Sequence, residues 1–408
     1  MDIAKVVRAM MGKPEIYFAN MGHGEAIAFE INGQWYLRDF GESSSKRDDE
    51  KQCCVNKILT SCCSQECIFN KLISQNIKCD VIVSHCHSDH ICGFERLFNE
   101  RRSKIFRNAF MPIQYLQKNI IDQKCFLHYI EANLHIFCFA KQRKYRSNAQ
   151  AFLTMPLIMS TLADRVHYLY SDSRNCAFPG TVYCPTGGLA LDDLSNGYDI
   201  EKNLGDYYRL NSIKDTSSER FRNTASEIYE IIKKYIDNDT KTNVEESAPK
   251  DYKSILHKIN ELKKESSAKS RNVRILQYFV KGSIDDRSLV FDVAFPGSTE
   301  INVLFLGDNN DTSLRRLIRN FKKHYDFIKA DHHGSRGGKV LKNFFDISSS
   351  GSKVITTVCC CGAGHRSGTV NPEYNDMSKR VLWTEKKPTW NNFSSHEVGN
   401  CKISPHDL

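Results

Sequence analysis

Short apolar runs separated by turn residues open the chain. Strand-forming segments are expected at 16–19, 26–31 and 35–39, where apolar and β-branched residues cluster. The pair Asn32-Gly33 between the second and third runs is a strong signal for a two-residue hairpin. The first fifty residues therefore predict an antiparallel β-meander, and a helix is expected to follow up to about residue 76.

The middle of the chain has a helical pattern. Residues from roughly 113 to 170 are predicted to be mostly helical, and residues 180–185 form a short strand that stops at a proline. From about 190 the composition shifts to Asp, Lys, Glu, Asn and Ser, with apolar residues at helical spacing, as in Ile228, Ile232 and Tyr235. We interpret 190–272 as a mostly helical insertion, a hairpin of helices joined by a loop at 238–250.

Strand patterns return in the last third of the chain, and two of the strands are each followed by a single helix. The predicted strands are 275–280, 288–293, 302–306, 327–330 and 353–358, and the predicted helices are 313–323 and 339–345. Together with the opening meander, this order predicts the α/β class, with two sheets packed face to face and helices outside. We expect a single domain over 1–408 that contains the insertion.

Composition and charge narrow the class of protein. The 408 residues are 40% hydrophobic and 26% charged, which is ordinary for a globular protein. No apolar run approaches the roughly 18 residues needed to cross a bilayer, so no membrane role is expected. The first residues lack the apolar core of a signal peptide, and the 16 cysteines then predict a reducing, cytoplasmic location. The net charge of +9 favours acidic partners, including nucleic acid.

The segment 81–90, Val-Ile-Val-Ser-His-Cys-His-Ser-Asp-His, carries four metal-ligand side chains directly after an apolar run. Alternation along a strand puts His85 and His87 on one face, so both imidazoles can reach one ion. Asp89 and His90 fall where a helix is expected to begin, so they can reach a second ion. Histidines that only satisfy hydrogen bonds in a core are the alternative, but it requires three of them to gather here by chance.

Two later segments supply further ligands. Asp308 follows an apolar strand and a glycine, where it is suited to bridge two divalent ions, although Gly-Asp pairs also occur in plain turns. His332 and His333 follow another apolar strand, and one of them can ligate while the other contacts substrate or a carboxylate. His365 lies between glycines on an expected loop, beside Arg366, and is suited to phosphate contact or proton transfer.

With these motifs in order, the sequence resembles the metallo-β-lactamase superfamily, and in particular the soluble β-lactamase-like domain of ComEC-type DNA-uptake proteins. The resemblance covers residues 14 to about 110 and 275 to 375. The segments that carry it are 16–26, 38–41, 85–93, 285–290, 306–308, 332–335 and 364–365.

The resemblance implies an αββα sandwich and a hydrolase with two divalent metal ions, zinc first and manganese or magnesium as alternatives. The predicted metal ligands are His85, His87, Asp89, His90, Asp308, His332 and His333. The predicted catalytic residues are Asp89, His365 and Asp39, of which Asp39 either orients a ligand histidine or caps a turn. The predicted substrate-binding residues are Ser335, Arg336 and Arg366.

The sequence departs from the family pattern at several positions. Glu25 replaces a turn aspartate, Phe40 a glycine and Asp285 an asparagine, and Gly337 stands where relatives often have a hydroxyl residue. Many members of the superfamily take a further histidine ligand from the middle of the chain. His128, His135 and His167 are available for that role here, and none is assigned to it.

Three functions are weighed. The first is a phosphodiesterase on nucleic acid, DNA before RNA, that uses a hydroxide generated by two metal ions. The second keeps the metal site but hydrolyses a small ester, thioester, lactone or phosphoester, since a fold does not fix a substrate. The third is a partly decayed site, suggested by the changes at Glu25, Phe40 and Gly337, in a protein whose insertion at 190–272 binds a protein partner within a larger complex. A role of a nuclease in antiviral defence is a further hypothesis.

Overall fold

A computed structural model gives the fold of the chain. It describes residues 16–19, 24–42, 55, 68–74, 77–101, 103–112, 120–171, 177–185, 199–213, 215–236, 244–266, 271–296, 300–322, 324–335, 337–348, 354–359, 373–383 and 401–403.

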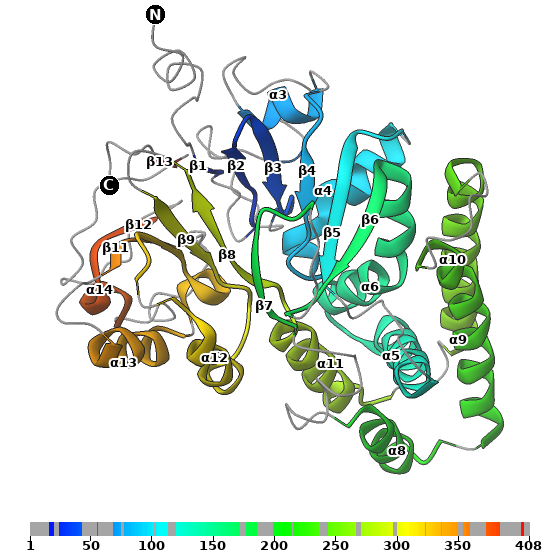
Figure 1. The fold of residues 1–408 in the computed structure, drawn as a ribbon. Helices are drawn as coiled ribbons and strands as arrows, with labels where there is room; N and C mark the ends of the chain where they lie inside the picture. Colours follow the sequence, from blue (N-terminus) through cyan, green and yellow to red (C-terminus); the bar gives the residue numbers. More distant parts are fainter. Residues whose placement is uncertain are drawn as a thin grey trace, which may run out of the picture.

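The first of two mixed β-sheets has the strand order β13-β1-β2-β3-β4-β5-β6 (Figure 1). Its strands β1 to β3 form the predicted antiparallel meander, and β3 to β6 run parallel to one another. The strand bounds are β1 Ile16–Phe18, β2 Ile27–Ile31, β3 Gln34–Arg38, β4 Asp80–Ile82, β5 Phe106–Pro112, β6 Ala163–Leu169 and β13 Cys401–Ile403.

The second sheet has the order β12-β11-β10-β9-β8-β7. Strands β9 to β12 are parallel, whereas β7, β8 and β9 are antiparallel. The bounds are β7 Gly180–Cys184, β8 Val290–Phe295, β9 Ile301–Phe305, β10 Phe327–Lys329, β11 Val354–Cys359 and β12 Ser378–Trp383. Five of the six, β7 to β11, were predicted from the sequence in this order, whereas β12 was not predicted.

Helices cover the outer faces of both sheets (Figure 1). The side chains between the sheets are largely aromatic, and the rings of Phe29 and Phe305 stack with centroids 5.2 Å apart. The predicted αββα sandwich is therefore confirmed. The helices are α3 Ile68–Ser74, α4 Ser88–Glu100, α5 Ile120–Phe139, α6 Arg143–Leu162, α8 Ile200–Leu210, α9 Asp215–Ile236, α10 Val244–Ser266, α11 Arg274–Asp286, α12 Asp311–Leu317, α13 Gly338–Ser348 and α14 Glu373–Met377, with short 3-10 turns η2 Ile318–Asn320 and η3 Asp331–Gly334.

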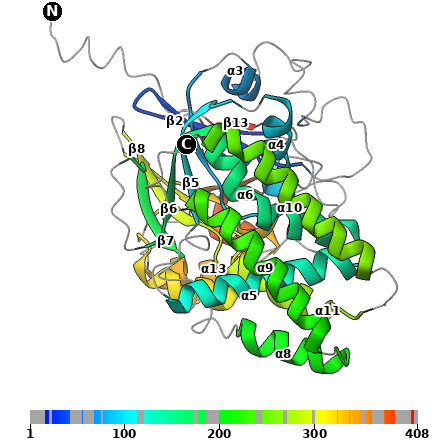
Figure 2. The ribbon, with the colours of Figure 1, turned by 90° about the vertical axis from the view of Figure 1, so that its right-hand side faces the viewer.

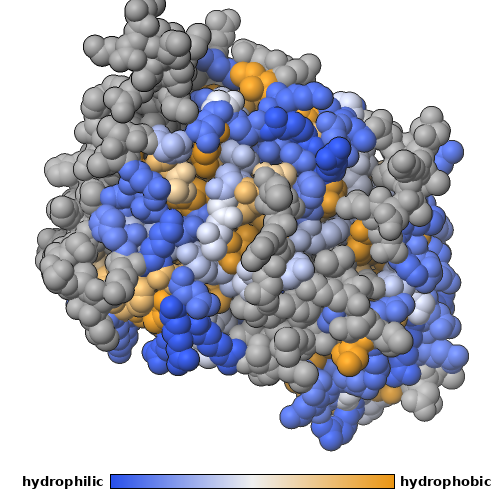
Figure 3. All heavy atoms as spheres, viewed as in Figure 1, coloured by the Kyte–Doolittle hydropathy of each residue, from blue (hydrophilic) through white to orange (hydrophobic). Residues whose placement is uncertain are grey.

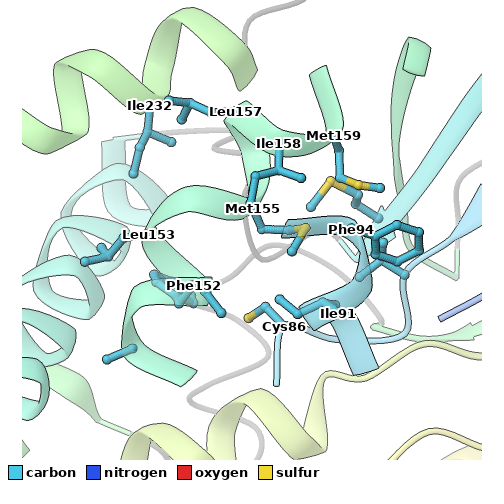
Figure 4. Packing of buried hydrophobic residues seen from close by; sticks show 14 of the residues in the cluster. Cys86, Ile91, Phe94, Phe152, Leu153, Met155, Leu157, Ile158, Met159 and Ile232 are labelled. Carbon is cyan, nitrogen blue, oxygen red and sulfur yellow. The ribbon is translucent and has the colours of Figure 1, made fainter. Parts of the chain in front are cut away.

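Helix α6 is packed on both sides. Its buried methionines Met155 and Met159 lie near Ile91 and Phe94 of α4, while Ile232 of α9 approaches from the other side (Figure 4). Methionine fills the irregular space between helices well because its side chain is unbranched and polarisable. This packing fixes α4, whose first turn carries Asp89 and His90, against the sheet.

The described part of the range 190–272 is helical, as the polar composition with helical spacing predicted, but it contains three helices where a hairpin was expected. Helices α9 and α10 lie over α5 and α6 as a further outer layer (Figure 2). Tyr252 of α10 donates a hydrogen bond to Glu95 of α4, with 2.8 Å between its hydroxyl and Oε1. That the range is an insertion stays a prediction. The predicted loop at 238–250 is wrong in its second half, because α10 already begins at Val244 and buries Ala248.

The predicted strand at 275–280 is wrong, because this segment lies in α11. The apolar run fits both strand and helix periods, and short runs of this kind cannot be assigned by periodicity alone. In the structure Leu276, Phe279, Val280 and Ile284 are buried, which is helical spacing, whereas Tyr278 is 86% exposed.

The end of the helical region at 113–170 was also wrong. Residues 163–169 form β6, the edge strand of the first sheet, which pairs with β5 in parallel. Its apolar residues do not alternate strictly, so the strand gave no period-two pattern. Of the helix predicted to end at about residue 76, the structure describes only Val55 and α3, and both are helical.

The hydropathy of the described helices and of the surface in Figure 3 bears on a membrane role. No helix among the described residues is both long and apolar enough to cross a membrane. On the face in Figure 3, the described side chains are mostly hydrophilic, and apolar ones lie in small separate groups. Isolated apolar side chains of this kind are normal on protein surfaces.

Candidate metal centre

The predicted site residues follow the carboxyl ends of neighbouring parallel strands. In the first sheet, Asp39 follows β3 and the segment 85–90 follows β4; in the second, Asp308 follows β9 and His332 follows β10. The two sheet edges are joined directly, since Leu289 N donates to the Ser84 carbonyl across 2.9 Å. The sandwich therefore brings these four segments, which are far apart in the sequence, to one place.

One group of ligand atoms comprises His85, His87 and Asp285. His85 Nε2 lies 3.0 Å from His87 Nδ1, and His87 Nδ1 lies 3.1 Å from Asp285 Oδ1. All three side chains are buried. Asp285 was noted in the sequence only as a departure from the family pattern, and its place beside the two histidines was missed.

A second group comprises Asp89, His90 and His333. Asp89 Oδ2 lies 3.8 Å from His333 Nε2, and the rings of His90 and His333 have centroids 5.5 Å apart. Of the two adjacent histidines, it is thus His333 that joins Asp89 and His90.

Asp308 lies between the two groups. Its Oδ2 is 3.6 Å from His85 Nε2 of the first group and 3.7 Å from His90 Nε2 of the second. The same oxygen is 2.8 Å from His332 Nδ1. One carboxylate oxygen in contact with both groups is the arrangement expected of a bridging ligand.

The donor set fits divalent cations. Within each group the ligand atoms lie within 4.8 Å of one another, and imidazoles with carboxylates are ligands that zinc and manganese accept. In the part of the chain that the structure describes, Asp89 Oδ1 and His90 Nε2 are buried with no hydrogen-bond partner. Buried polar atoms are rarely left without one, so a ligand at these atoms accounts for their burial.

The ionisation of His85 and Asp308 suits cations as well. Burial and the neighbouring His90 lower the pKa of His85 well below its ordinary value, which keeps this imidazole neutral. Burial alone would raise the pKa of Asp308, but His332, His85 and His90 outweigh it and hold that pKa well below its usual range. A neutral imidazole and an ionised carboxylate are the forms that bind metal.

Asp39 holds the imidazole of His90 in place. Its Oδ2 lies 2.9 Å from His90 Nδ1, and both of its oxygens accept from Ser84, one from the backbone N–H and one from the hydroxyl. Burial opposes its charge, but Arg38 and His90 lower the pKa of Asp39 to about 2. A permanently ionised carboxylate on Nδ1 leaves Nε2 of His90 directed at the cluster.

Ser288 ties two of the ligand segments together. Its hydroxyl donates to the Asp285 carbonyl across 2.7 Å and accepts from the backbone N–H of Asp308 across 2.6 Å. Gly307 makes this approach possible, because a Cβ at that position would lie 2.1 Å from Ser288 Oγ. Ser288 is thus a positioning residue that sequence reasoning recorded only as part of a family motif.

The two adjacent histidines lie on a strained turn. His332 and His333 both have positive φ, 40° and 58°, which side-chain-bearing residues rarely adopt. Ser335 donates its hydroxyl to the His332 carbonyl across 2.8 Å and so closes the turn. The turn points one imidazole at Asp308 and the other at Asp89, and strain of this kind is common where function requires a geometry.

The three additional histidines lie in other surroundings. His135 is buried in the layer of α5, α8 and α9, where its ring stacks on Phe221 at 3.8 Å. His167 bonds to Asn108 on the neighbouring strand, and burial lowers the pKa of His128 on α5. None of the three belongs to a metal-ligand group among the described residues. Arg336, His365 and Arg366 lie outside the described residues, so their predicted roles stay predictions.

A buried ionic network lies behind the site and links the two sheets. Lys329 of β10 approaches Glu25, which lies just before β2 of the first sheet, with 2.6 Å between Nζ and Oε2, and Arg38 pairs with the same carboxylate. Arg38 also lies 3.4 Å from Asp39 Oδ2. All four side chains are fully buried. Glu25, which departs from the family pattern, therefore has two basic partners.

Close backbone contacts hold the first turn of α4 in place. Glu25 N donates to the Asp89 carbonyl across 3.0 Å, and Phe40 N donates to the His90 carbonyl across 2.7 Å. A Cβ on Gly41 would lie 2.1 Å from the Asp89 carbonyl oxygen. The glycine is required because backbone, which cannot rotate away, occupies that space.

We expect Gly41→Ala to destabilise the protein by about 1–3 kcal/mol, the usual cost of overpacking a filled core. Denaturant unfolding followed by circular dichroism measures the effect. Gly205→Ala in α8 is the matched control, since its Cβ would meet nothing within 4 Å and the helix should gain up to about 1 kcal/mol. Equal stabilities for the two variants would contradict the tight contact at Asp89.

Comparison with known proteins identifies no family for the chain. No family model and no curated protein matches it. Among solved structures, the crystal structure of a long form RNase Z from yeast aligns with 96% of this chain at 11% sequence identity and a TM-score of 0.31. The chain spans 42% of the length of that protein. So weak a likeness carries no argument for an activity, and the site rests on its own geometry.

Proposed function

We propose that this chain is a metal-dependent hydrolase of the metallo-β-lactamase superfamily that cleaves phosphodiester bonds in nucleic acid. The observation that carries the proposal is the meeting of eight ligand-type side chains from four separate segments in one buried cluster. The eight are His85, His87, Asp89, His90, Asp285, Asp308, His332 and His333.

Each group would hold one divalent ion. His85, His87 and Asp285 are the ligands proposed for the first ion, and Asp89, His90 and His333 for the second, with Asp308 shared. Two histidines and a carboxylate per ion suit zinc first and manganese as an alternative, and magnesium less well. When bound, such ions lower the pKa of a coordinated water toward neutrality and neutralise charge on a phosphoryl group.

Two residues of the cluster would orient the attacking water and protonate the leaving oxygen. Asp89 is held ionised, because contacts with His333, His90 and Lys144 outweigh the burial that would raise its pKa. Its buried Oδ1 is suited to accept a hydrogen bond from an attacking water and to orient it. His332, whose side chain is 19% exposed, lies at the solvent side of Asp308 and is a candidate to protonate the leaving oxygen, a role for which the sequence suggested His365.

Nucleic acid is the proposed substrate for two reasons. A chain with a net charge of +9 attracts polyanions. Paired metal ions suit the hydrolysis of phosphodiesters, because the attacking oxygen of water and the leaving ester oxygen both carry negative charge during the reaction. The ComEC-like resemblance stays a prediction that points the same way. A protein partner for 190–272 and a cytoplasmic location also stay predictions.

The substitutions that suggested a decayed site lie outside the proposed ligands. The Phe40 ring packs against Phe94 with centroids 5.9 Å apart, and its carbonyl accepts from Gly93 N. Gly337 has a φ of +74° and donates its N–H to Asp311, so glycine suits that turn. These positions are accommodated by packing, which supports an intact site.

The proposal is tested by loading the protein with zinc, manganese or magnesium and incubating it with labelled single- and double-stranded DNA and RNA. We expect cleavage with at least one metal, and loss of cleavage on treatment with a chelator and in His87→Ala. His257→Ala on α10, away from the cluster, is the matched control and should cleave as the wild type does. Absence of cleavage with every metal would overturn the proposed function.

A further inference from the structure

Helix α11 presents one polar stripe that leads to the metal centre. Arg274, Tyr278, Lys281 and Asp285 follow at intervals of four, three and four residues, which places them on one face of the helix. The buried stripe, with Leu276, lies on another face. The polar stripe spans about 16 Å of helix axis and ends at Asp285, a proposed metal ligand.

The stripe forms one wall of a groove. The groove has a volume of about 600 Å³, in the range of sites that take small organic molecules. Its second wall comes from the beginning of α6. The walls are lined by Gln142, Tyr145, Arg274, Gln277, Tyr278 and Lys281.

The inner end of the groove meets the metal centre. Asp285 lines its floor, and Oδ1 of this residue lies 3.1 Å from His87 Nδ1. On the α6 side, Lys144 Nζ lies 3.8 Å from Asp89 Oδ2 of the second ligand group. Asp286 also lines the floor, but it accepts the backbone N–H of Asn310, with 2.8 Å between the atoms. A chain lying in this groove would enter the cluster from the solvent.

The chemistry of the walls fits a polynucleotide strand. Arg274 is exposed and Lys281 half-buried, and they flank Tyr278, which is 86% exposed. A single exposed aromatic ring is ordinary on a surface, but one between two cations in a groove has the parts of a single-strand site. Aromatic rings stack on unpaired bases of any sequence, while Lys and Arg neutralise the phosphates.

We propose that the groove between α6 and α11 binds single-stranded nucleic acid, with Tyr278 stacked on a base and Arg274 and Lys281 against phosphates, and that it guides the strand to the metal centre. This inference rests on the proposed function for the site at its inner end. A duplex is disfavoured, because its bases are already stacked on each other and leave no face for Tyr278.

The test measures binding of fluorescently labelled single-stranded and duplex DNA to the full, metal-loaded chain by fluorescence anisotropy. We expect the single strand to bind more tightly than the duplex. Tyr278→Ala should weaken single-strand binding by about 5- to 100-fold, and Tyr278→Trp should restore it, because stacking needs only a ring. The pair Arg274→Glu and Lys281→Glu should make the negative slope of log affinity against log salt less steep by about 1.4, since two phosphate contacts are lost.

Charge-reversed Lys263→Glu and Lys264→Glu on α10, which line a separate groove, are the matched control and should leave the salt slope of single-strand binding less changed. Unchanged binding in Tyr278→Ala, or tighter binding of the duplex, would overturn the inference. Turnover of bis(4-nitrophenyl) phosphate by the wild-type protein tests the metal centre separately. If that turnover is present while Tyr278→Ala binds DNA as the wild type does, only the groove proposal fails.

Discussion

Asp308→Asn is expected to reduce hydrolysis by at least about a thousandfold, equivalent to roughly 4 kcal/mol of transition-state stabilisation. Asp308 Oδ2 lies 3.6 Å from His85, 3.7 Å from His90 and 2.8 Å from His332, so this oxygen is close to both ligand groups. An amide of the same shape removes its negative charge while it keeps the packing. The charge that would hold two cations side by side is then lost.

The measurement has two parts, kcat/KM on the substrate cleaved by the wild type and metal content by mass spectrometry. We expect the variant to lose at least one ion per chain and to keep its fold by circular dichroism. Asp164→Asn, a partly exposed carboxylate that lies 3.7 Å from Lys78 at the surface, is the matched control. A variant at position 308 with full metal content and full activity would exclude a bridging role.

The local part of the site could be predicted from the sequence because it lies within six residues. Strand alternation and the start of a helix are short-range properties, so the motif containing His85 and His90 could be placed without tertiary information. The strands before Asp308 and His332 were likewise apolar enough to identify. Since parallel strands of one sheet end at a common edge, Asp308 and His332 could be expected near each other. Their approach to the motif, which follows a strand of the other sheet, was expected from the family resemblance.

The role of Asp285 could not be predicted in the same way. It lies near the end of α11, in a segment whose apolar run was taken for a strand, and an incorrect element gives an incorrect direction for every side chain in it. Its contact with His87 depends on how α11 packs against α5 and α8, which no local pattern encodes. The choice between His332 and His333 had the same difficulty, since it depends on two positive φ values.

The pairing of Glu25 with Lys329 could not be predicted from the sequence either. Each residue stands near a strand end, and a lysine in a strand of mixed pattern is ordinarily taken to face solvent. The two meet only because the sheets pack face to face, where Lys329 is fully buried. Departure from a family pattern at Glu25 suggested decay, whereas the structure gives it two basic partners.

We expect Lys329→Met and Glu25→Gln each to destabilise the protein by about 3–5 kcal/mol, the usual cost of removing one partner of a buried ion pair. Lys329→Met leaves Glu25 and Asp39 to share Arg38, which lies 3.4 Å from Asp39 Oδ2. Glu25→Gln leaves two buried cations with Asp39 as their nearest carboxylate in the network. Either change upsets a balance of two positive and two negative charges among four fully buried side chains.

The double variant Glu25→Gln with Lys329→Met restores that balance, so it should be at least about 2 kcal/mol more stable than the sum of the single effects predicts. Denaturant unfolding of the wild type, the two single variants and the double variant, a double-mutant cycle, gives the coupling energy between Glu25 and Lys329. Lys124 and Glu201 form a solvent-exposed pair 2.8 Å apart, and the same cycle on them should give a coupling below about 1 kcal/mol. A coupling energy in the buried cycle no larger than in the exposed one would mean that the charges of this network do not hold the two sheets together. The aromatic packing between the sheets would then account for their stability.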